Sequence, residues 1–506
     1  MTIKRLVLVV LTAVAICLIG LDLLSSFNRL QIQSQLELYQ TNLVLQATEL
    51  QGDQSGLASA RQVLLQGEPL KSAADQYEEA RQSAQKSLKQ TQLLLESADS
   101  SQVATLQQSA LELQRLLTQL DLNLGILQVE QAQVEAAQQT WAEAKQQADL
   151  AALEPWSQTA DVLAGLWSRP AQLMPEAEPL LKKQLNGWFR YRGLTQLYQL
   201  QQRQTSLAEL QVAEQQTAER SLRSLAITGG MPVLGCLLGV GILLFLLAQW
   251  GIQKKQALLS PSGMPAWSTP WGGEVIWEVL IFGFFLASQL LLPLGLGLLR
   301  SAQIIPTNLD DRAIAISALV TYVVAAIWSL GILFLAIKPF LPLPDGWFRV
   351  TLQGRWWFWG VGGYLAALPL VILVSLINQQ IWQGKGGSNP ILSIALENKD
   401  GIALAIFFLT ASIAAPIFEE LLFRGFLLPS LSRYFPMWGA IALSSFIFAI
   451  AHLNLSEVLP LTTLGMVLGF VYVRSRNLLS SMLLHGIWNS GTLLSLLILG
   501  SATSSS

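Results

Sequence analysis

The stretch IALAIFFLTASIAAPIFEELLF, residues 402–423, is apolar over the length needed to cross a membrane, yet it contains the adjacent acids Glu419 and Glu420. An ionisable side chain at hydrocarbon depth costs several kcal/mol, so such residues are rare there and typically mark a functional site. The two histidines of the chain, His452 and His485, also lie in apolar stretches. These four residues are therefore the first candidates for function.

The composition is typical of a membrane protein. Of the 506 residues, 52% are hydrophobic and only 13% are charged, which is about half the charged share of a soluble domain. The mean hydropathy is +0.44. The net charge of −2 gives no indication of nucleic-acid binding. We therefore expect a multi-pass integral membrane protein whose surroundings are a lipid bilayer, in a bacterial plasma membrane or a thylakoid-type membrane.

Hydropathy predicts an all-α polytopic transmembrane bundle of about nine spans. The first covers residues 6–24, and the others cover 228–250, 275–299, 313–337, 358–381, 402–423, 437–457, 459–473 and 478–499. We expect four parts. They are an N-terminal anchor (1–27), an extramembrane helical region (28–225), a second span with its linker (226–270) and a membrane-embedded domain (271–500).

Residues 28–225 differ from the rest in composition, because they are rich in Gln, Leu, Ala and Glu, which are good helix formers. Leu113, Leu116, Leu117 and Leu120 show the three- and four-residue spacing of a helix face. We predict four to six long helices in an elongated bundle or coiled coil. The positive-inside rule keeps Lys4 and Arg5 in the cytoplasm, which places this region on the non-cytoplasmic side.

The acids of the first stretch are expected to differ in role. Residues four apart share a helix face, so Glu420 can pair with Arg424, whereas Glu419 has no such partner in its own helix. Pro416 cannot donate a backbone hydrogen bond and should loosen the helix ahead of Glu419. We expect the Ser412 hydroxyl to satisfy part of that defect.

The histidines belong to two further motifs with the same spacing. In FAIAH, Phe448 and His452 share a face, so the phenyl ring can form one wall beside the imidazole. In HGIWN, His485 and Asn489 can direct hydrogen-bond donors at one point. By the predicted span limits, His452 differs in membrane depth from Glu419 and His485 by about 10–15 Å. A shared site therefore requires tilted helices or span limits that differ from these by several residues.

This set of side chains supports hydrolysis without a serine or cysteine nucleophile. A carboxylate and an imidazole can deprotonate a water, and a second imidazole with an amide can donate to an oxyanion. Zinc is the alternative, with Glu419, His452 and His485 as ligands of the right types. The zinc-protease motif HExxH is absent from the sequence.

The order EExxxR, FxxxH, HxxxN resembles the CPBP (Abi) family of intramembrane proteases, which includes type II CAAX prenyl endopeptidases. The resemblance covers roughly residues 275–499, and it leaves 28–225 as an added region. It implies an endopeptidase, of glutamate or metalloprotease type, that cleaves a membrane-associated protein or peptide. By resemblance, Glu419 and His452 activate the water, and His485 with Asn489 stabilises the oxyanion. Glu420 and Arg424 then support the first helix.

Two other classes of function compete with proteolysis. In one, the chain is a catalytically silent membrane sensor or scaffold, and residues 28–225 bind a partner. In the other, the buried acids and histidines relay protons in a transporter, which would be expected to show internal repeats that this sequence lacks. Oligomeric state, prenylation of the substrate and metal dependence stay open.

Overall fold

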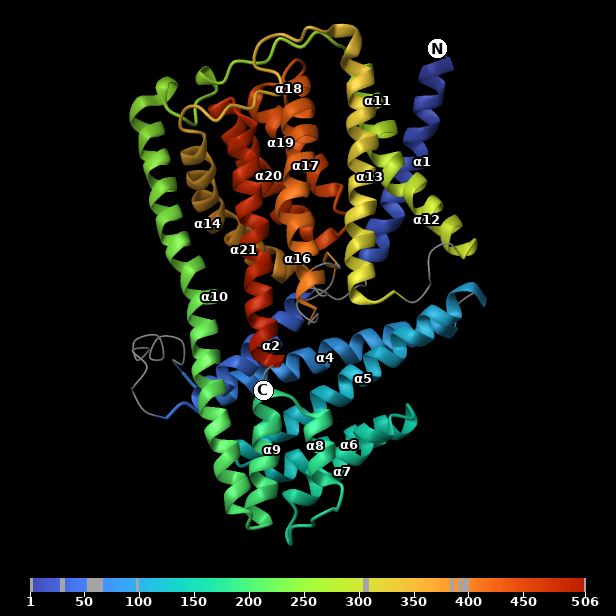
Figure 1. Ribbon diagram of the computed structural model, residues 1–506, viewed down its shortest axis with the longest axis vertical. Helices are drawn as coiled ribbons and strands as arrows, with labels where there is room; N and C mark the ends of the chain where they lie inside the picture. Colours follow the sequence, from blue (N-terminus) through green and yellow to red (C-terminus); the bar gives the residue numbers. More distant parts are fainter. Residues whose placement is uncertain are drawn as a thin grey trace. The chain divides into compact units, whose positions relative to one another are not determined.

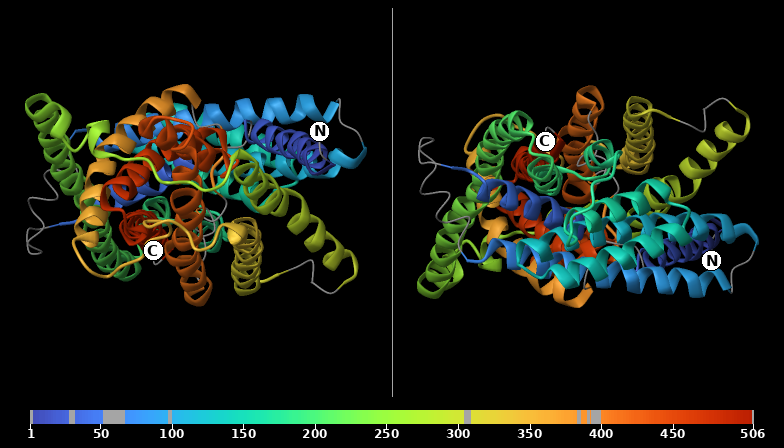
Figure 2. Two further views of the ribbon diagram at one scale, coloured as in Figure 1. Left: turned by 90° about the horizontal axis from the view of Figure 1, so that it is seen from above. Right: turned by 90° about the horizontal axis from the view of Figure 1, so that it is seen from below.

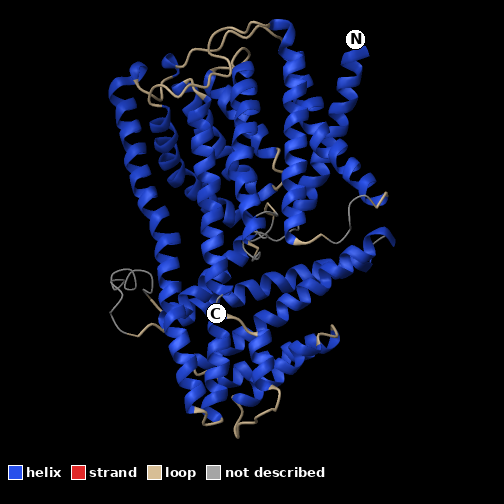
Figure 3. Ribbon diagram, viewed as in Figure 1, coloured by secondary structure: helices blue, strands red, loops and turns tan. Residues whose placement is uncertain are grey.

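The computed structural model describes residues 3–27, 32–51, 67–96, 100–303, 309–382, 386–389, 392 and 400–504. These residues form helices and no strands (Figure 3), so the predicted all-α class is confirmed. Contacts divide the chain into two compact units. The membrane unit comprises Met1–Ile32 and Met231–Leu497, and the helical unit comprises Gln33–Gly230 and Ile498–Ser506.

The helical unit contains seven helices and the start of an eighth within its described residues. They are α2 (Ile32–Thr48), α4 (Pro69–Glu96), α5 (Ser100–Glu130), α6 (Val134–Leu150), α7 (Glu154–Leu166), α8 (Ala177–Gln184), α9 (Gly187–Leu200) and the beginning of α10 (Gln204–Gln253). Among the first seven, only α4 and α5 exceed 20 residues, with 28 and 31. The prediction of four to six long helices was therefore wrong in number and length.

Three helices end at left-handed residues that are neither glycine nor proline, although the break at Glu154-Pro155, just after the second of them, is expected from the sequence. Ala132, Ala152 and Gln202 adopt the left-handed conformation, with φ of 61°, 53° and 56°. Each is followed by an amide that donates to a carbonyl five residues earlier, which is the Schellman arrangement that closes a helix. The pairs are Gln133 to Gln128, Leu153 to Ala148 and Arg203 to Tyr198, at 2.8, 2.8 and 2.9 Å.

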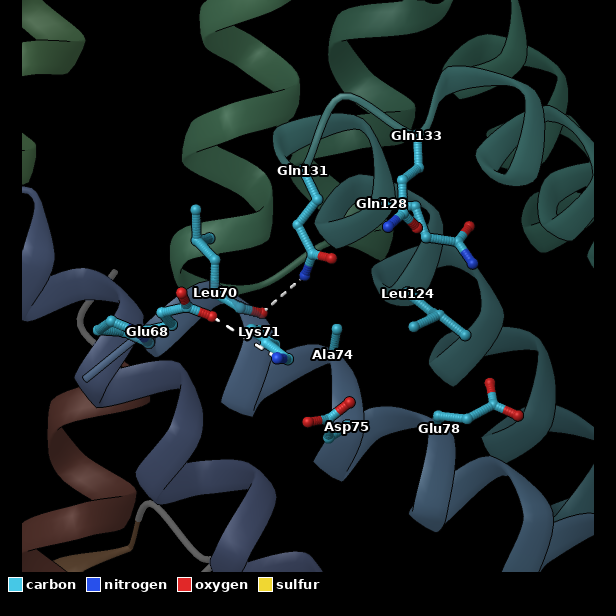
Figure 4. Close-up of a pocket in the computed structure, with 11 residues that line it drawn as sticks. Glu68, Leu70, Lys71, Ala74, Asp75, Glu78, Leu124, Gln128, Gln131 and Gln133 are labelled. Carbon is cyan, nitrogen blue, oxygen red and sulfur yellow. Dashed lines mark hydrogen bonds and ion pairs between the residues drawn. The ribbon is translucent and has the colours of Figure 1, made fainter.

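A tryptophan lies at the centre of the helical unit. The Trp141 indole is fully buried and donates to the Leu122 carbonyl at 3.1 Å. A Cβ at Gly125 would lie 2.2 Å from this indole, so glycine permits the close approach of α5 and α6. The unit also has an open pocket of about 710 Å³ between α4 and α5, where Gln131 donates to the Leu70 carbonyl (Figure 4).

The membrane unit contains the remaining helices (Figure 1). They are α1 (Ile3–Ser26), the later part of α10, α11 (Gly273–Glu278), α12 (Leu292–Ser301), α13 (Asp311–Ile337), α14 (Trp356–Trp382), α16 (Gly401–Leu409), α17 (Ala415–Glu419), α18 (Leu428–Leu431), α19 (Met437–Ile450), α20 (Val458–Ser475) and α21 (Leu478–Ser504). Within the described residues, eight helical stretches are long and apolar enough to cross a membrane.

The seventh predicted span is shorter than expected, and it is the one that is not long enough to cross a membrane among the described helices. The segment 437–457 was predicted as one span, but α19 has only 14 residues and ends at Ile450. The chain turns there because Leu453 is left-handed, with φ of 60°. By contrast, the segment predicted as short, 459–473, lies within a helical stretch of 21 residues, Leu455–Ser475. His452 thus lies in a turn beyond α19 and not inside a span.

Helix α13 stands between α12 and the column formed by α16, α17 and α18 (Figures 1 and 2). Its first turn is capped by Asp310, whose carboxylate accepts from the Ala313 amide at 2.8 Å. Arg312 then donates to Asp400, the residue that caps α16. These contacts place α13 against the helix that leads to the two acids.

The turn after His452 is fixed by segments distant in sequence. The Asn378 amide donates to the Ser456 carbonyl at 2.6 Å, and the Leu455 amide donates to the Ser26 hydroxyl at 3.2 Å. The Ser456 hydroxyl donates to the Gly387 carbonyl. The ends of α1 and α14 therefore hold the loop that carries His452.

Candidate active site

The helix that carries the two acids is interrupted on both sides of Glu419. The segments Thr410–Ala414 and Glu420–Leu427 have π-helical hydrogen bonding, and the short α17 lies between them. Such widened turns are frequent at functional sites. Pro416 lies in this stretch, as expected for a helix that it loosens. The expected compensation by Ser412 was wrong, because its buried hydroxyl has no hydrogen-bond partner among the described residues.

Glu420 and Arg424 pair as their spacing predicts. Arg424 Nη1 donates to Glu420 Oε1 at 2.8 Å, and both side chains are almost completely buried. The guanidinium also donates to the Gly465 carbonyl of α20 and lies 4.5 Å from the centre of the Phe448 ring. The pair therefore ties the acid helix to α19 and α20.

Glu419 is held from another helix. Its Oε1 accepts a hydrogen bond from the Tyr322 hydroxyl of α13 at 3.0 Å. Its Oε2 is buried without a hydrogen-bond partner among the described residues, and lies 3.8 Å from Nε2 of His485. One oxygen of this carboxylate is thus anchored, and the other is available to a bound molecule.

His485 lies between the two acids. Its Nδ1 is 2.9 Å from Glu420 Oε1, and its Nε2 faces Glu419. Because a carboxylate only accepts, Nδ1 is the donor in this hydrogen bond. The side chain is 4% exposed, so Glu420 fixes the ring in one orientation.

His452 is oriented by its own helix. Its Nδ1 lies 2.9 Å from the Phe448 carbonyl, which can only accept, so Nδ1 carries a proton, and in the neutral imidazole Nε2 is the acceptor. The Phe448 ring packs edge-on against His452, with centroids 4.9 Å apart, and against His485, with centroids 5.8 Å apart. The expected wall beside one imidazole is therefore a wall shared by two.

Asn489 makes a contact that its spacing did not predict. Its amide Nδ2 donates to the Ala411 carbonyl, in the π-helical turn before α17, at 2.7 Å. An amide group has two hydrogens, so one remains for another acceptor. Asn489 and His485 do line the same space, as expected, but part of the amide is used to hold the acid helix.

One cavity of about 770 Å³ collects the predicted residues. Glu419, His452, His485 and Asn489 all line it, so the depth difference estimated from the predicted spans does not separate them. The supporting residues Glu420 and Arg424 follow Glu419 in the same helix and are not part of the cavity lining. Phe448 does not line the cavity but packs against both imidazoles.

The cavity also contains residues that the motifs did not identify. Tyr322 gives no signal in sequence, because a tyrosine in an apolar helix is ordinary. Glu457 could have been found, because it is an acid within the predicted span 437–457. Its carboxylate accepts from the Asn389 backbone amide at 2.8 Å and from the Asn454 side chain at 3.2 Å.

The described residues do not form a preformed zinc site. His452, His485 and Glu419 are ligands of suitable type, but no group of three or more His, Cys, Asp or Glu side chains in the described part of the chain is arranged to hold a metal ion. Glu420 orients His485 through Nδ1 and leaves Nε2 facing Glu419.

Comparison with known proteins supports the motif assignment. Residues 401–491 match the family model described as Type II CAAX prenyl endopeptidase Rce1-like. The chain is also 26% identical over 132 residues to a Bacillus subtilis (strain 168) protein named "Putative membrane peptidase YdiL"; the match covers 26% of this chain and 53% of the relative. The chain thus spans about half the length of that relative. No solved structure matches. The resemblance is confirmed, and at family level it supports a membrane protease.

Proposed function

We propose that the chain is an intramembrane endopeptidase that cleaves a membrane-associated protein or peptide with a water activated by Glu419 and His452. The observation that carries this proposal is the shared cavity, lined by one acid, two imidazoles and one carboxamide. Within it, Oε2 of Glu419 has no hydrogen-bond partner among the described residues, and Nε2 of His452 is an acceptor in the neutral imidazole. A water that donates to two acceptors directs its oxygen lone pairs elsewhere, toward a substrate carbonyl.

The chemical steps follow from these protonation states. The water oxygen attacks the carbonyl carbon, one water proton passes to Glu419, and the carbonyl electrons move onto oxygen. When the C–N bond breaks, Glu419 returns the proton to the leaving amine, and the acid and amine products separate. His452 accepts a hydrogen bond from the water through Nε2 and keeps it in place.

The oxyanion is stabilised by His485 and Asn489. Since Nδ1 of His485 donates to Glu420, donation through Nε2 requires the imidazolium form, whose charge lies between two carboxylates. Asn489 supplies its second amide hydrogen. Each preorganised donor of this kind contributes on the order of 100-fold to kcat.

The test is cleavage of a reporter peptide library in detergent by the wild-type chain, Glu419→Gln, His452→Ala and His485→Ala. Glu274→Gln is the matched control, because Glu274 is a surface acid that pairs with Lys4 and Arg5. We expect turnover in the wild type and the control and its loss in the other three. Equal turnover in all five proteins would contradict the proposal.

A second candidate function is a silent sensor or scaffold in which the helical unit binds a partner. The observation in its favour is that this unit has its own core and an open pocket lined by Glu68, Asp75, Glu78 and Lys71 (Figure 4). On this hypothesis, a strain whose only copy carries Glu419→Gln keeps its wild-type phenotype. On the protease hypothesis, it behaves like a strain without the chain.

A further inference from the structure

Helix α13 contributes a residue to the site from outside the motifs. It ends at Ile337, well before residue 401, where the family match begins. From this helix the Tyr322 hydroxyl donates to Oε1 of Glu419, the one hydrogen bond of that carboxylate within the described residues. The two residues are 97 positions apart in sequence.

The tyrosine ring is itself held rigidly. It packs edge-on against Phe418, with centroids 5.8 Å apart and planes at 86°. Phe418 is the residue directly before Glu419 and is only 5% exposed. The Tyr322 hydroxyl and the Glu419 carboxylate are therefore held together by their hydrogen bond and by the contact between the rings of Tyr322 and Phe418.

We propose that Tyr322 is the positioning residue of Glu419: by holding Oε1, it leaves Oε2 as the oxygen that binds and deprotonates the water. Without this contact the Glu419 carboxylate could rotate, and either of its two oxygens could then face His485 and the cavity. The cost of such misplacement falls on the chemical step, since a displacement of about 1 Å at the reacting atoms lowers the rate by about 100-fold. This inference rests on the proposed function.

A merely structural role for Tyr322 makes a different prediction. A buried tyrosine hydroxyl needs an acceptor, and Glu419 would serve as one without any consequence for turnover. In that case, removal of the hydroxyl lowers the thermal stability and leaves kcat unchanged. The two roles therefore separate in one variant that keeps the ring.

The test compares Tyr322→Phe with Tyr472→Phe. Tyr472 is equally an internal tyrosine, fully buried and stacked on Trp267, but its hydroxyl has no hydrogen-bond partner among the described residues, and it does not line the cavity. The full-length proteins in detergent are assayed for kcat, KM and Tm with a cleaved reporter peptide. We expect Tyr322→Phe to lower kcat on the order of 100-fold at unchanged KM. We expect the Tm of Tyr322→Phe to equal that of Tyr472→Phe. We expect Tyr472→Phe to keep the wild-type kcat.

Three outcomes would overturn the inference. They are an unchanged kcat in Tyr322→Phe, a change confined to KM, and a loss of activity that accompanies a Tm well below that of Tyr472→Phe. Failure of the proposed function is recognised separately. In that case the wild-type protein cleaves no reporter, or Glu419→Gln cleaves as well as the wild type.

Discussion

Glu420 accepts a hydrogen bond from Nδ1 of His485 at 2.9 Å, so a fully buried acid sets the orientation of an imidazole that lines the cavity. Each acid has one buried oxygen without a hydrogen-bond partner among the described residues, but the other oxygen of Glu420 accepts from both Arg424 and His485, whereas that of Glu419 accepts from Tyr322. Two neighbouring carboxylates on one helix thus have different surroundings. This difference leads to opposite expectations for their substitution.

Glu420→Gln is expected to destabilise the membrane unit. It leaves the buried Arg424 guanidinium without its ion-pair partner, and breaking a buried pair from one side costs about 3–5 kcal/mol. Glu419→Gln keeps the acceptor for Tyr322 and removes only the longer 3.8 Å contact with Nε2 of His485, so its Tm should lie closer to that of the wild type. Thermal unfolding in detergent measures both. A lower Tm for Glu419→Gln than for Glu420→Gln would contradict the assignment.

Phe448 is expected to be among the residues least tolerant of truncation. Its ring is fully buried, contacts both histidines and lies against Arg424. Phe448→Ala should cost about 3–5 kcal/mol of unfolding free energy, because it removes the ring and leaves a cavity. Phe448→Leu should cost less and still lower kcat. The matched control is Phe446→Ala, at an exposed position of the same helix.

Removal of metal ions should leave peptide cleavage intact. This expectation rests on the arrangement of the donors, since the described residues include no cluster of three or more possible ligands. Turnover is measured before and after dialysis against a chelator, together with zinc content by elemental analysis. Activity that disappears on dialysis and returns with stoichiometric zinc would assign the enzyme to the metalloprotease type instead.

The helical unit should lose stability as the pH rises through about 6. Burial raises the pKa of Asp121 from 3.8 to about 6, and Arg81 beside it only partly offsets this because it is shared with Glu143. An acid with a raised folded-state pKa contributes stability that is present below its unfolded pKa and is lost as the pH rises through the folded pKa. The loss is at most about 3 kcal/mol.

The measurement is amide hydrogen exchange in α4 and α5 between pH 4.5 and 7.5, corrected for the intrinsic exchange rate. Protection in the wild type should decrease across this range. Asp121→Asn cannot titrate, so its protection should vary less with pH. A wild type and a variant with the same pH dependence would show that Asp121 is not the responsible group.

The sequence predicted contacts that depend on helix spacing and missed those that depend on tertiary packing. The pairs Glu420–Arg424 and Phe448–His452 follow from four-residue spacing, and both are present. The Tyr322–Glu419 hydrogen bond joins helices far apart in sequence, and no local pattern indicates it. The same holds for the contact of Asn489 with the Ala411 carbonyl.

The missed helix ends have a different cause. Glycine and proline are the residues that mark such ends in a sequence, and the left-handed positions Ala132 and Gln202 are neither. Both are exposed, and the helices are closed there by the local hydrogen bonds from Gln133 to Gln128 and from Arg203 to Tyr198, which a spacing argument does not contain. The same reason explains why α19 ends at Ile450, before the left-handed Leu453, although apolar residues continue.

The position of Phe448 between the two imidazoles has a consequence for how substrate preference can diverge. Any change in the size of that ring disturbs both histidines at once, although the ring itself does not line the cavity. The cavity lining includes Ile314, Ala318 and Ala325 of α13, which make no described hydrogen bond or ring contact with Glu419, His452, His485 or Asn489. On the proposed function, substitutions that alter substrate preference are therefore expected at these three positions of α13 and not at Tyr322 between them, whose hydroxyl holds Glu419.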